Sequence, residues 1–331
     1  KNGIYDTIIS EIEKAGLSGY EISGVKPNPE IALAYQGARL CREGGIDLII
    51  AAGGGSVIDT AKVIAGSAAY EGDPWDLVKN RVQLTRALPL IAIPTMAATG
   101  SEMNSCAVIT NPQTLEKYGW TTEPLRPKVS FLCPRNTYTV SPFQTASGSA
   151  DILSHLLEVY LNREEGFDSM DGFMESMMRS VIRWAPIAMA EGSNEEARAN
   201  LLWDSEWAIN DLIDRGHSVA WSCHGLEHEL SAWYDIPHGL GLAILTPAFM
   251  SHVLSEETAP RFAVHVMGVK EGKNPEKTAR KGIKKLKKFL TTSLQLPGSL
   301  SAISIDDSHF EEMADNDLAW KGKDGIIQGF V

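Results

Sequence analysis

Residues 47–62 read DLIIAAGGGSVIDTAK, and this stretch decides the fold class of the N-terminal part. The apolar run at residues 48–52 stops at three glycines, as a buried parallel strand would, and a helical pattern resumes over residues 57–65. Glycines let the backbone approach a phosphate closely, and a helix N-terminus offers free N–H groups. Two structural alternatives remain open: the glycines form only a tight left-handed turn, and Ser56 with Asp59 forms a capping box.

The neighbouring segments continue the alternation of helices and strands. Apolar spacing predicts helices over residues 4–16 and 29–44, and a second buried strand over residues 88–93. Such alternation favours a Rossmann-like parallel sheet. The loop TMAATGSE, residues 95–102, places small hydroxyl side chains where these sheets bind ligands, although taken alone it is better explained as an ordinary polar connection.

The pattern changes after Pro142. Helical spacing predicts helices, with no convincing strand, over residues 143–161, 168–191, 194–215, 218–233 and 275–291. We therefore predict a protein with a Rossmann-like α/β domain over residues 1–142 and an all-helical domain over residues 143–331.

Composition limits the classes of function. A formal net charge of −12 argues against nucleic acid as a partner, and the basic run at residues 281–288 is interpreted as the solvated face of a helix opened by Asn274 and Pro275. The apolar stretches are too short to span a bilayer, and the first residues show no signal-peptide pattern, so we expect a cytoplasmic protein without a membrane partner. Free thiols in a reducing compartment are expected for the scattered cysteines, which are Cys41, Cys106, Cys133 and Cys223.

Two segments carry metal-ligand residue types at helical spacing. Asp151 and His155 lie four residues apart and share a helix face, which alone is more often a surface ion pair or a satisfied polar contact. Residues 224–239 read HGLEHELSAWYDIPHG, in which His224 and His228 are again four apart and His238 follows in a Pro-His-Gly turn. Oxygen and nitrogen donors without thiolate suit Fe(II), Zn(II) or Mn(II), and they favour a catalytic metal over a structural zinc.

Four segments in this order make the pattern specific: GGGSVIDTAK, IPTMAATGSE, DILSHLLEVY and HGLEHELSAWYDIPHGLGLAIL. They resemble the iron-containing (group III) alcohol dehydrogenase family, closest to its butanol dehydrogenase branch, over nearly the whole chain. The resemblance implies that the metal ligands are Asp151, His155, His224 and His238, and that His228 is a catalytic, non-ligand histidine beside the nicotinamide and substrate. It also implies a dinucleotide site made of Gly53, Gly54, Gly55, Ser56, Thr95, Thr99 and Lys117, with the last near the nicotinamide ribose.

The implied reaction is hydride transfer between NAD or NADP and a small uncharged aldehyde or primary alcohol such as butanal or butanol. A divalent metal, Fe(II) in the first place and Zn(II) as the alternative, would polarise the carbonyl oxygen. The site should lie in the cleft between the domains, and we expect a homodimer. Apolar residues near the histidines, namely Leu156, Leu157, Trp233 and Tyr234, favour an uncharged substrate.

Two other functions remain open. A lyase similar to dehydroquinate synthase has a related fold, but it would need basic residues to hold a substrate phosphate. A non-catalytic metal-binding protein is the second alternative. Members of the resembling family also carry an opening strand and a first Gly-rich turn before the residue equivalent to Lys1, and they continue past Val331. Because that first turn touches the adenosine ribose and its 2′-phosphate in close relatives, the choice between NAD and NADP stays open.

Overall fold

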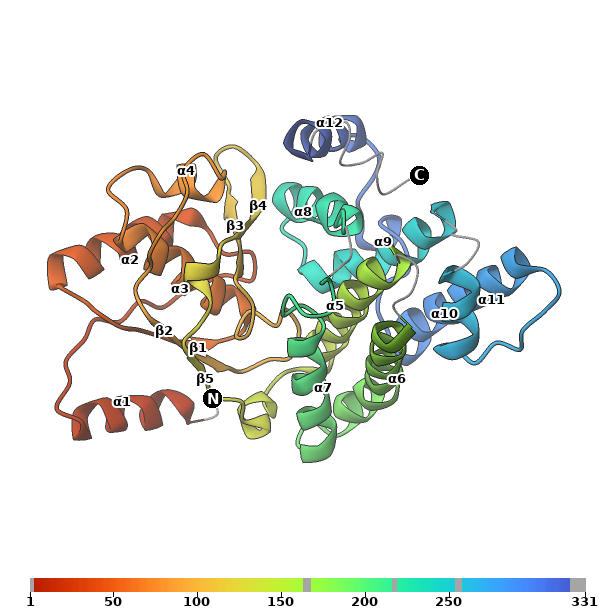
Figure 1. Ribbon diagram of the computed structural model, residues 1–331, viewed down its shortest axis with the longest axis horizontal. Coiled ribbons are helices and arrows are strands. Elements are labelled where there is room, and N and C mark those ends of the chain that lie inside the picture. The colour runs from red at the N-terminus through yellow and green to blue at the C-terminus, as the bar shows by residue number, and fades with distance from the viewer. Residues whose placement is uncertain (1–2, 163–167, 216–218, 254–257, 322–331) are drawn as a thin grey trace.

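A computed structural model describes residues 3–162, 168–215, 219–253 and 258–321. Figure 1 shows an α/β part and a helical part side by side, with helix α5 (Pro142–Leu161) beginning where the chain passes from the first to the second. Every described element after Pro142 is helical, as predicted. The domain boundary after residue 142 stays a prediction.

The α/β part is built on a parallel sheet, which confirms the predicted fold class. Strands β1 (Ile49–Gly53), β2 (Leu90–Pro94) and β5 (Val129–Ser130) pair in the order β1-β2-β5. Helix α3 (Gly55–Ala68) follows β1 directly and is buried along most of its length, which brings its N-terminus to the carboxyl edge of the sheet. The other helices of this part are α1 (Ile4–Lys14), α2 (Ile31–Gly44) and α4 (Pro74–Val78).

An antiparallel hairpin that the sequence analysis did not predict completes this part. Strands β3 (Cys106–Asn111) and β4 (Glu116–Thr121) pair so that Thr110 lies opposite Lys117. Trp120 anchors β4 because it is 1 % exposed and belongs to the apolar core of this part. Two short 3-10 helices, Glu123–Leu125 and Pro134–Thr137, lead from the hairpin to α5.

Among its described residues, the helical part contains the five predicted helices and three further α-helices. The predicted ones are α5, α6 (Asp168–Ala190), α7 (Glu195–Trp207), α8 (Ser222–Tyr234) and α11 (Pro275–Lys288). The additional ones are α9 (His238–His252), α10 (Thr258–His265) and α12 (Phe310–Lys321). Helix α9 escaped prediction because it is apolar on nearly all sides and carries Pro247 in its interior, so it shows no amphipathic stripe.

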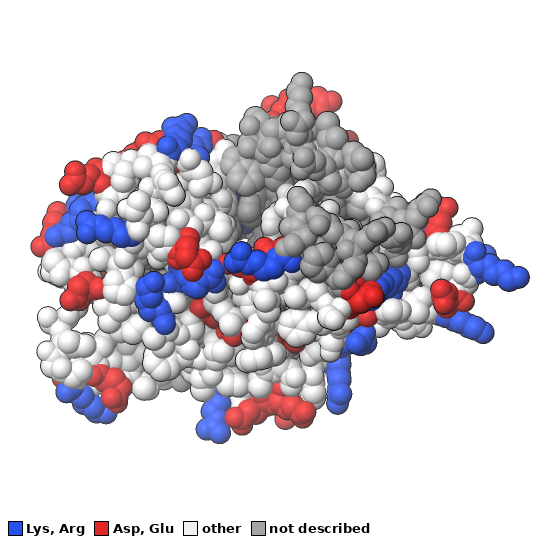
Figure 2. All heavy atoms as spheres, in the orientation of Figure 1, with Lys and Arg blue, Asp and Glu red and all other residues white. Residues whose placement is uncertain are grey.

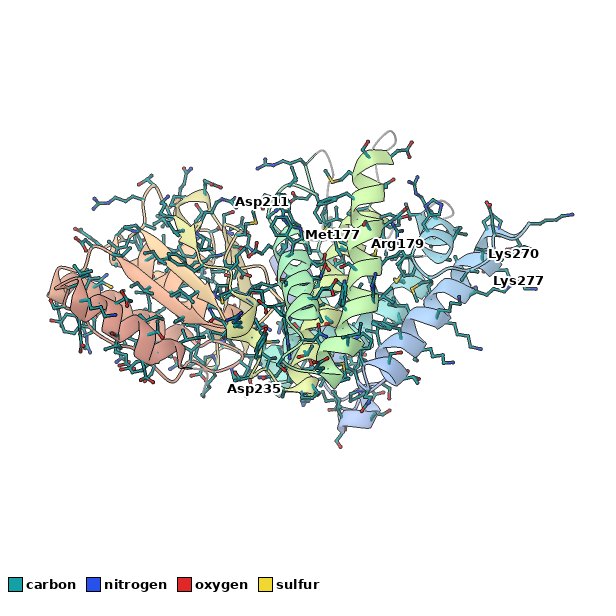
Figure 3. The ribbon with its side chains drawn as sticks, turned by 90° about the horizontal axis from the view of Figure 1, so that it is seen from below. Met177, Arg179, Asp211, Asp235, Lys270 and Lys277 are labelled. Carbon is teal, nitrogen blue, oxygen red and sulfur yellow. The ribbon has the colours of Figure 1, made fainter. Side chains whose placement is uncertain are left out.

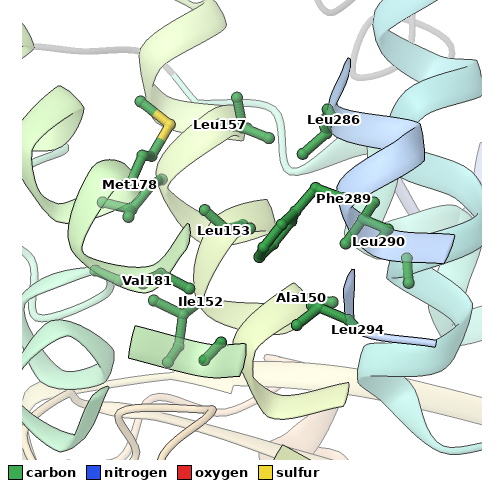
Figure 4. Close-up of a cluster of buried hydrophobic side chains, with 14 of the residues drawn as sticks. Ala150, Ile152, Leu153, Leu157, Met178, Val181, Leu286, Phe289, Leu290 and Leu294 are labelled. Atoms are coloured by element: carbon green, nitrogen blue, oxygen red, sulfur yellow. The ribbon is translucent and has the colours of Figure 1, made fainter. Parts of the chain in front are cut away.

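Helix α5 is the central helix of this part. Its Leu153 and Leu157 face Phe289 and Leu286, the latter at the end of α11, and each of these residues is less than 9 % exposed (Figure 4). Burying each leucine stabilises the fold by about 1.5–3 kcal/mol. Packing on this face fixes the rotation of α5 and turns its polar residues toward the α/β part.

Charged side chains of both signs lie on the visible surface (Figure 2). Acidic and basic side chains are interspersed over the coloured part of the face in Figure 2. The lysines of residues 281–288 are exposed on α11, where Asn274 caps the helix by accepting from the N–H of Lys277, so the solvated-face interpretation is confirmed. The four cysteines are free. Across the described residues, no helix combines the length and the apolar composition that crossing a bilayer requires.

Candidate active site

A cavity of about 1240 Å³ lies between the two parts. From the helical part it is lined by all five residues singled out above, Asp151, His155, His224, His228 and His238. From the α/β part it is lined by Gly54, Gly55, Ser56, Thr95, Thr99 and Lys117, whereas Gly53 does not reach it. The expected cleft between the parts is therefore present, and both groups of candidate residues face it.

Three histidines converge on one carboxylate oxygen. The Nε2 atoms of His155, His224 and His238 lie 3.5, 3.9 and 3.6 Å from Oδ1 of Asp151. Asp151 and His155 come from one face of α5, His224 from α8 and His238 from the first residue of α9, after Pro237 as N-cap. The structure thus brings the four predicted ligands together from three helices.

Two of the four donor atoms are buried without a hydrogen bond to a described residue. Asp151 is 2 % exposed and His224 is 7 % exposed, yet Asp151 Oδ1 and His224 Nε2 have no hydrogen-bond partner among the described residues. An unsatisfied buried polar atom costs roughly 1–3 kcal/mol, and more if it is charged. A cation among these atoms would remove that cost, so the residues fit a divalent metal.

The protonation states suit metal binding. Burial, together with His224 and His238, lowers the pKa of His155 to about 3, although Asp151 opposes this shift. Burial alone would raise the pKa of Asp151, but His155, and then His224 and His238, hold it below its usual value. His155 is therefore a neutral imidazole and Asp151 a carboxylate at neutral pH, the forms that bind metals.

His224 differs because a second carboxylate contacts it. Burial would lower its pKa, but Glu158 and Asp151 raise it to about 9. Without a metal, His224 therefore holds a proton at neutral pH, which metal binding must displace.

Two glutamates that the sequence analysis missed orient the histidines. Glu158 Oε1 lies 2.5 Å from Nδ1 of His224, and Glu227 binds Nδ1 of His238. Carboxylates that bind the second ring nitrogen fix the orientation of metal-binding histidines and raise their basicity. Spacing was the available signal, since Glu158 follows Asp151 by seven residues and Glu227 follows His224 by three, both of which keep a residue on the same helix face.

His228 lies beside these donors. It is 9 % exposed, its ring centroid is 5.5 Å from that of His238, and it lines the cavity. Together with Glu227 and His238 it forms a group whose potential ligand atoms lie within 4.8 Å of one another, next to the group of Asp151, His155 and His224, because His238 Nε2 also lies 3.6 Å from Asp151 Oδ1.

The three glycines do not form a tight left-handed turn, so that interpretation is wrong. None of them has a positive φ, and Gly54 is the N-cap of α3 at φ −74° and ψ −179°. A Cβ atom on Gly53 would lie 2.5 Å from Val57, and one on Gly55 would lie 2.2 Å from Thr99. On Gly54 the nearest atom would be Cβ of Met96 at 3.8 Å. Gly53 and Gly55 are therefore required for packing, whereas Gly54 keeps the space in front of the helix N-terminus open, as a phosphate site needs.

The capping-box interpretation is also wrong. Helix α3 begins at Gly55, and Ser56 Oγ donates to the carbonyl oxygen of Pro27 at 2.5 Å instead of capping the helix. Asp59 accepts from Ser101 Oγ at 2.5 Å and from the N–H of Val108 at 3.0 Å. These bonds join α3 to two neighbouring loops, at Pro27 and Ser101, and to strand β3 at Val108.

Lys62, another missed residue, holds the loop after β2. It is 0 % exposed, and its Nζ donates to Oδ1 and the carbonyl oxygen of Asn104 at 2.9 Å and to the carbonyl oxygen of Cys106 at 2.6 Å. Thr95 and Thr99 of this loop reach the cavity. The loop is thus an ordered part of the cavity wall, not only a polar connection.

The apolar wall of the cavity comes from residues other than those expected. Leu156 and Leu157 are 0 % and 1 % exposed in the core of the helical part, and Trp233 packs on His309 with ring centroids 4.6 Å apart. None of these, nor Tyr234, lines the cavity, so they do not form the wall of the site. The apolar lining is instead contributed by residues such as Phe143, Val159, Val219 and Trp221.

The lysine side chains of the lining are already paired. Within the described lining they are Lys26, whose Nζ lies 2.5 Å from Glu30, and Lys117, whose Nζ lies 3.5 Å from Glu227. A phosphate-bearing substrate, as a lyase similar to dehydroquinate synthase would require, finds no unpaired cation among these residues.

Comparisons with known proteins agree with this geometry. Two family descriptions match consecutive parts of the chain: iron-containing alcohol dehydrogenase over residues 1–134, and Fe-containing alcohol dehydrogenase family, C-terminal, over residues 145–325. NADH-dependent butanol dehydrogenase A of Clostridium acetobutylicum is 44 % identical over 317 residues, which cover 95 % of this chain and 81 % of the relative. An NADPH-dependent aldehyde reductase of Escherichia coli is 32 % identical over 93 % of this chain and 80 % of its own length.

A solved structure extends the likeness to the fold. The crystal structure of NADH-dependent butanol dehydrogenase A from Thermotoga maritima superposes with a TM-score of 0.93 at 37 % identity, covering 97 % of this chain and 81 % of that one. This structural match and the two family matches agree with the resemblance that the sequence motifs indicated. The chain therefore belongs to the iron-containing alcohol dehydrogenase family.

Proposed function

We propose that this oxidoreductase interconverts small uncharged aldehydes and primary alcohols, of the size of butanal and butanol, with a divalent metal and NAD or NADP. The observation that supports this most strongly is the convergence of three histidine Nε2 atoms on Asp151 Oδ1 in the cavity that Gly54 also faces. Phe143 and Trp221 in the lining and the paired state of Lys26 and Lys117 favour an uncharged substrate.

The proposed metal ligands are Asp151, His155, His224 and His238. When bound, the metal would act as a Lewis acid toward the substrate oxygen and the nicotinamide would carry the hydride. The donor set of one carboxylate and three imidazoles suits Fe(II), which we propose as the metal. Zn(II) binds such donors more tightly, so metal supply also decides occupancy.

The dinucleotide would lie across the cavity. Gly54, Gly55 and Ser56 at the N-terminus of α3 would receive the pyrophosphate, because helix N-terminal N–H groups favour anions. Thr95 and Thr99 would contact the adenosine side and Lys117 the nicotinamide ribose. Gly53 supports this site by packing only, since it does not reach the cavity.

His228 would orient the substrate or move a proton to and from its oxygen. It lines the cavity beside His238, with the two ring centroids 5.5 Å apart. An imidazole is the side chain best suited to proton transfer at neutral pH. The homodimer and the cytoplasmic location expected from the sequence stay predictions.

The test is metal analysis of anaerobically purified protein and of its His224→Ala variant, followed by assays of NADH and NADPH oxidation with butanal. We expect one divalent ion in the parent protein and a sharp loss in the variant, because His224 is one of four converging donors. His252→Ala, an exposed position at the end of α9, is the matched control and should keep the metal. Full metal content in the His224→Ala protein, or no oxidation of either nucleotide, would contradict the proposal.

A further inference from the structure

A partly buried polar bridge connects the α/β part to the segment that carries His238. Asn28, which is 5 % exposed, donates from Nδ2 to Asp235 Oδ1 at 2.8 Å and to the carbonyl oxygen of Ile236 at 3.1 Å. These two acceptors lie in the turn between α8 and α9, directly before Pro237 and His238. None of the roles proposed above for the metal or the nucleotide involves Asn28.

The α/β part holds Asn28 in place from both sides. The carbonyl oxygen of Pro27 accepts from Ser56 Oγ at 2.5 Å, and that of Pro29 accepts from the N–H of Thr110 at 2.8 Å. The two prolines restrict the backbone on either side of Asn28. The amide of Asn28 is thus presented from a segment that is tied to both α3 and the hairpin.

The turn that receives the amide has an uncommon conformation. Asp235 has φ 50°, in the left-handed region, where it ends α8. Aspartate tolerates this region better than most residues, but a partner that holds it there still stabilises the turn. Ser231 Oγ also donates to the carbonyl oxygen of Ile236, at 3.2 Å. The position of the next residues, including His238, depends on this turn.

A second route from Asn28 reaches His238 through its carboxylate partner. Lys117 Nζ donates to Asn28 Oδ1 at 3.1 Å and lies 3.5 Å from Oε2 of Glu227, the same oxygen that binds Nδ1 of His238. Lys117 and Glu227 are 3 % and 0 % exposed in their side chains, so this contact is shielded from water. Both routes therefore begin in the α/β part and end at one proposed metal ligand.

We infer that Asn28 is a positioning residue for His238, so that the metal affinity of the helical part depends on its contact with the α/β part. The inference rests on the metal site proposed above. Partners that orient metal-binding histidines typically change metal affinity by about 10–100-fold, and we expect about 10-fold here because Asn28 acts one step further out.

The experiment replaces Asn28 by leucine, which has similar volume and cannot form these bonds. Co²⁺ is titrated into the metal-free full chain without nucleotide, and both the chelator-competition affinity and the visible d–d spectrum are recorded. Asn28→Leu should weaken Co²⁺ binding about 10-fold and change the spectrum, because the orientation of His238 changes. Asn28 is preferred to Lys117, whose positive charge would itself oppose a cation and whose proposed nucleotide contact would complicate the result.

Arg126→Met is the matched control because it breaks a different bond between the parts. Arg126 Nη2 lies 2.5 Å from Asp211 Oδ2, and Figure 3 places Asp211 and Asp235 on opposite sides of the junction. This variant should bind Co²⁺ like the parent protein. Asp235→Ala removes the other half of the Asn28 bond, and it serves in place of Asn28→Leu if that protein does not fold.

Each outcome decides a separate point. Unchanged affinity and spectrum in Asn28→Leu, or equal weakening in Arg126→Met, would overturn the positioning role. If His224→Ala also keeps its Co²⁺, the metal site itself is wrong. If His224→Ala loses the metal while Asn28→Leu behaves like the parent protein, only the role of Asn28 fails.

Discussion

The proposed metal donors are side chains carried by helices α5, α8 and α9. The proposed dinucleotide cradle at Gly54 is instead formed by backbone N–H groups, and the space beside them stays open because glycine has no side chain. Both face one cavity. The donor cluster is held by buried partners, such as Glu158 on His224 and Glu227 on His238. The cradle is held by packing, since the positions on either side of Gly54 leave no room for a Cβ atom. The two halves of the active site should therefore respond differently to mutation.

The buried acids of the molecule also fall into two groups, which differ in the direction of their pKa shifts. Asp151 is surrounded by histidines, which hold its pKa below the usual value despite burial. Glu102 and Glu206 are 3 % and 2 % exposed, and Oε1 of each lacks a hydrogen-bond partner among the described residues. Burial raises the pKa of Glu102 to about 7 and that of Glu206 to about 8. Neighbouring histidines thus favour the charged form of Asp151, whereas burial favours the neutral forms of Glu102 and Glu206.

The largest effect is expected at His228, because we propose that it orients the substrate or transfers a proton while the other histidines of the site hold the metal. His228→Gln should lower kcat by about 10²–10⁴, the usual contribution of a positioned acid or base, while metal content stays near normal. Metal content and kcat are measured on the same sample, with His252→Gln as the exposed control. Loss of metal together with activity would place His228 among the ligands, and unchanged turnover would reduce it to a packing residue.

A smaller effect is expected at the cradle. Gly54→Val should weaken NAD(P)H binding by about tenfold or more, equivalent to about 1.4 kcal/mol, because the new side chain enters the space proposed for the pyrophosphate. Metal content and Tm should change little, since the nearest atom to a Cβ at this position is 3.8 Å away. Titration of nucleotide fluorescence measures the affinity.

Gly55→Ala is the matched variant for this prediction. A Cβ atom at Gly55 would lie 2.2 Å from Thr99 Oγ1, so this smaller substitution should lower Tm more than Gly54→Val does. Normal nucleotide binding by Gly54→Val would show that the glycine run is needed only for packing and that the pyrophosphate binds elsewhere.

The smallest effect is expected at Glu206. Its folded-state pKa of about 8 exceeds the ordinary value of 4.5, so the native state binds the proton more tightly than the unfolded state does. That stabilisation is complete below the ordinary pKa and is lost as the pH rises toward 8. Glu206→Gln cannot ionise, so its Tm should fall by about 1–2 °C less than that of the parent protein between pH 5 and pH 9, the change expected for roughly 1 kcal/mol in a chain of 331 residues.

Thermal unfolding of both proteins at pH 5, 7 and 9 checks this. Glu196→Gln, an exposed position on the same helix, should follow the parent protein at each pH. A parallel decline of the Glu206→Gln and parent curves would mean that Glu206 ionises in the folded protein without cost.

Much of the architecture followed from the sequence because its signals are local. Apolar runs and glycines predicted β1, β2 and the start of α3, and helical spacing predicted α5, α6 and α8. Asp and His at i and i+4 likewise indicated Asp151, His155 and His224 as candidate metal ligands, whereas the set of four that includes His238 and leaves out His228 came from the family resemblance. The β3–β4 hairpin and α9 were missed, the latter because an almost wholly apolar helix shows no periodic stripe.

Tertiary structure decided how these local pieces act on one another. Whether Gly54 serves a turn or an open cradle depends on Met96, more than forty residues away, and whether Ser56 caps a helix depends on Pro27. The bond between Asn28 and Asp235 spans 207 residues and is recorded in no local pattern. The sequence determines which hydrogen-bond donors, acceptors and side-chain volumes each segment carries. The role of a buried polar group or of an open space depends on the distant residues that folding places beside it, because buried polar groups need hydrogen-bond partners.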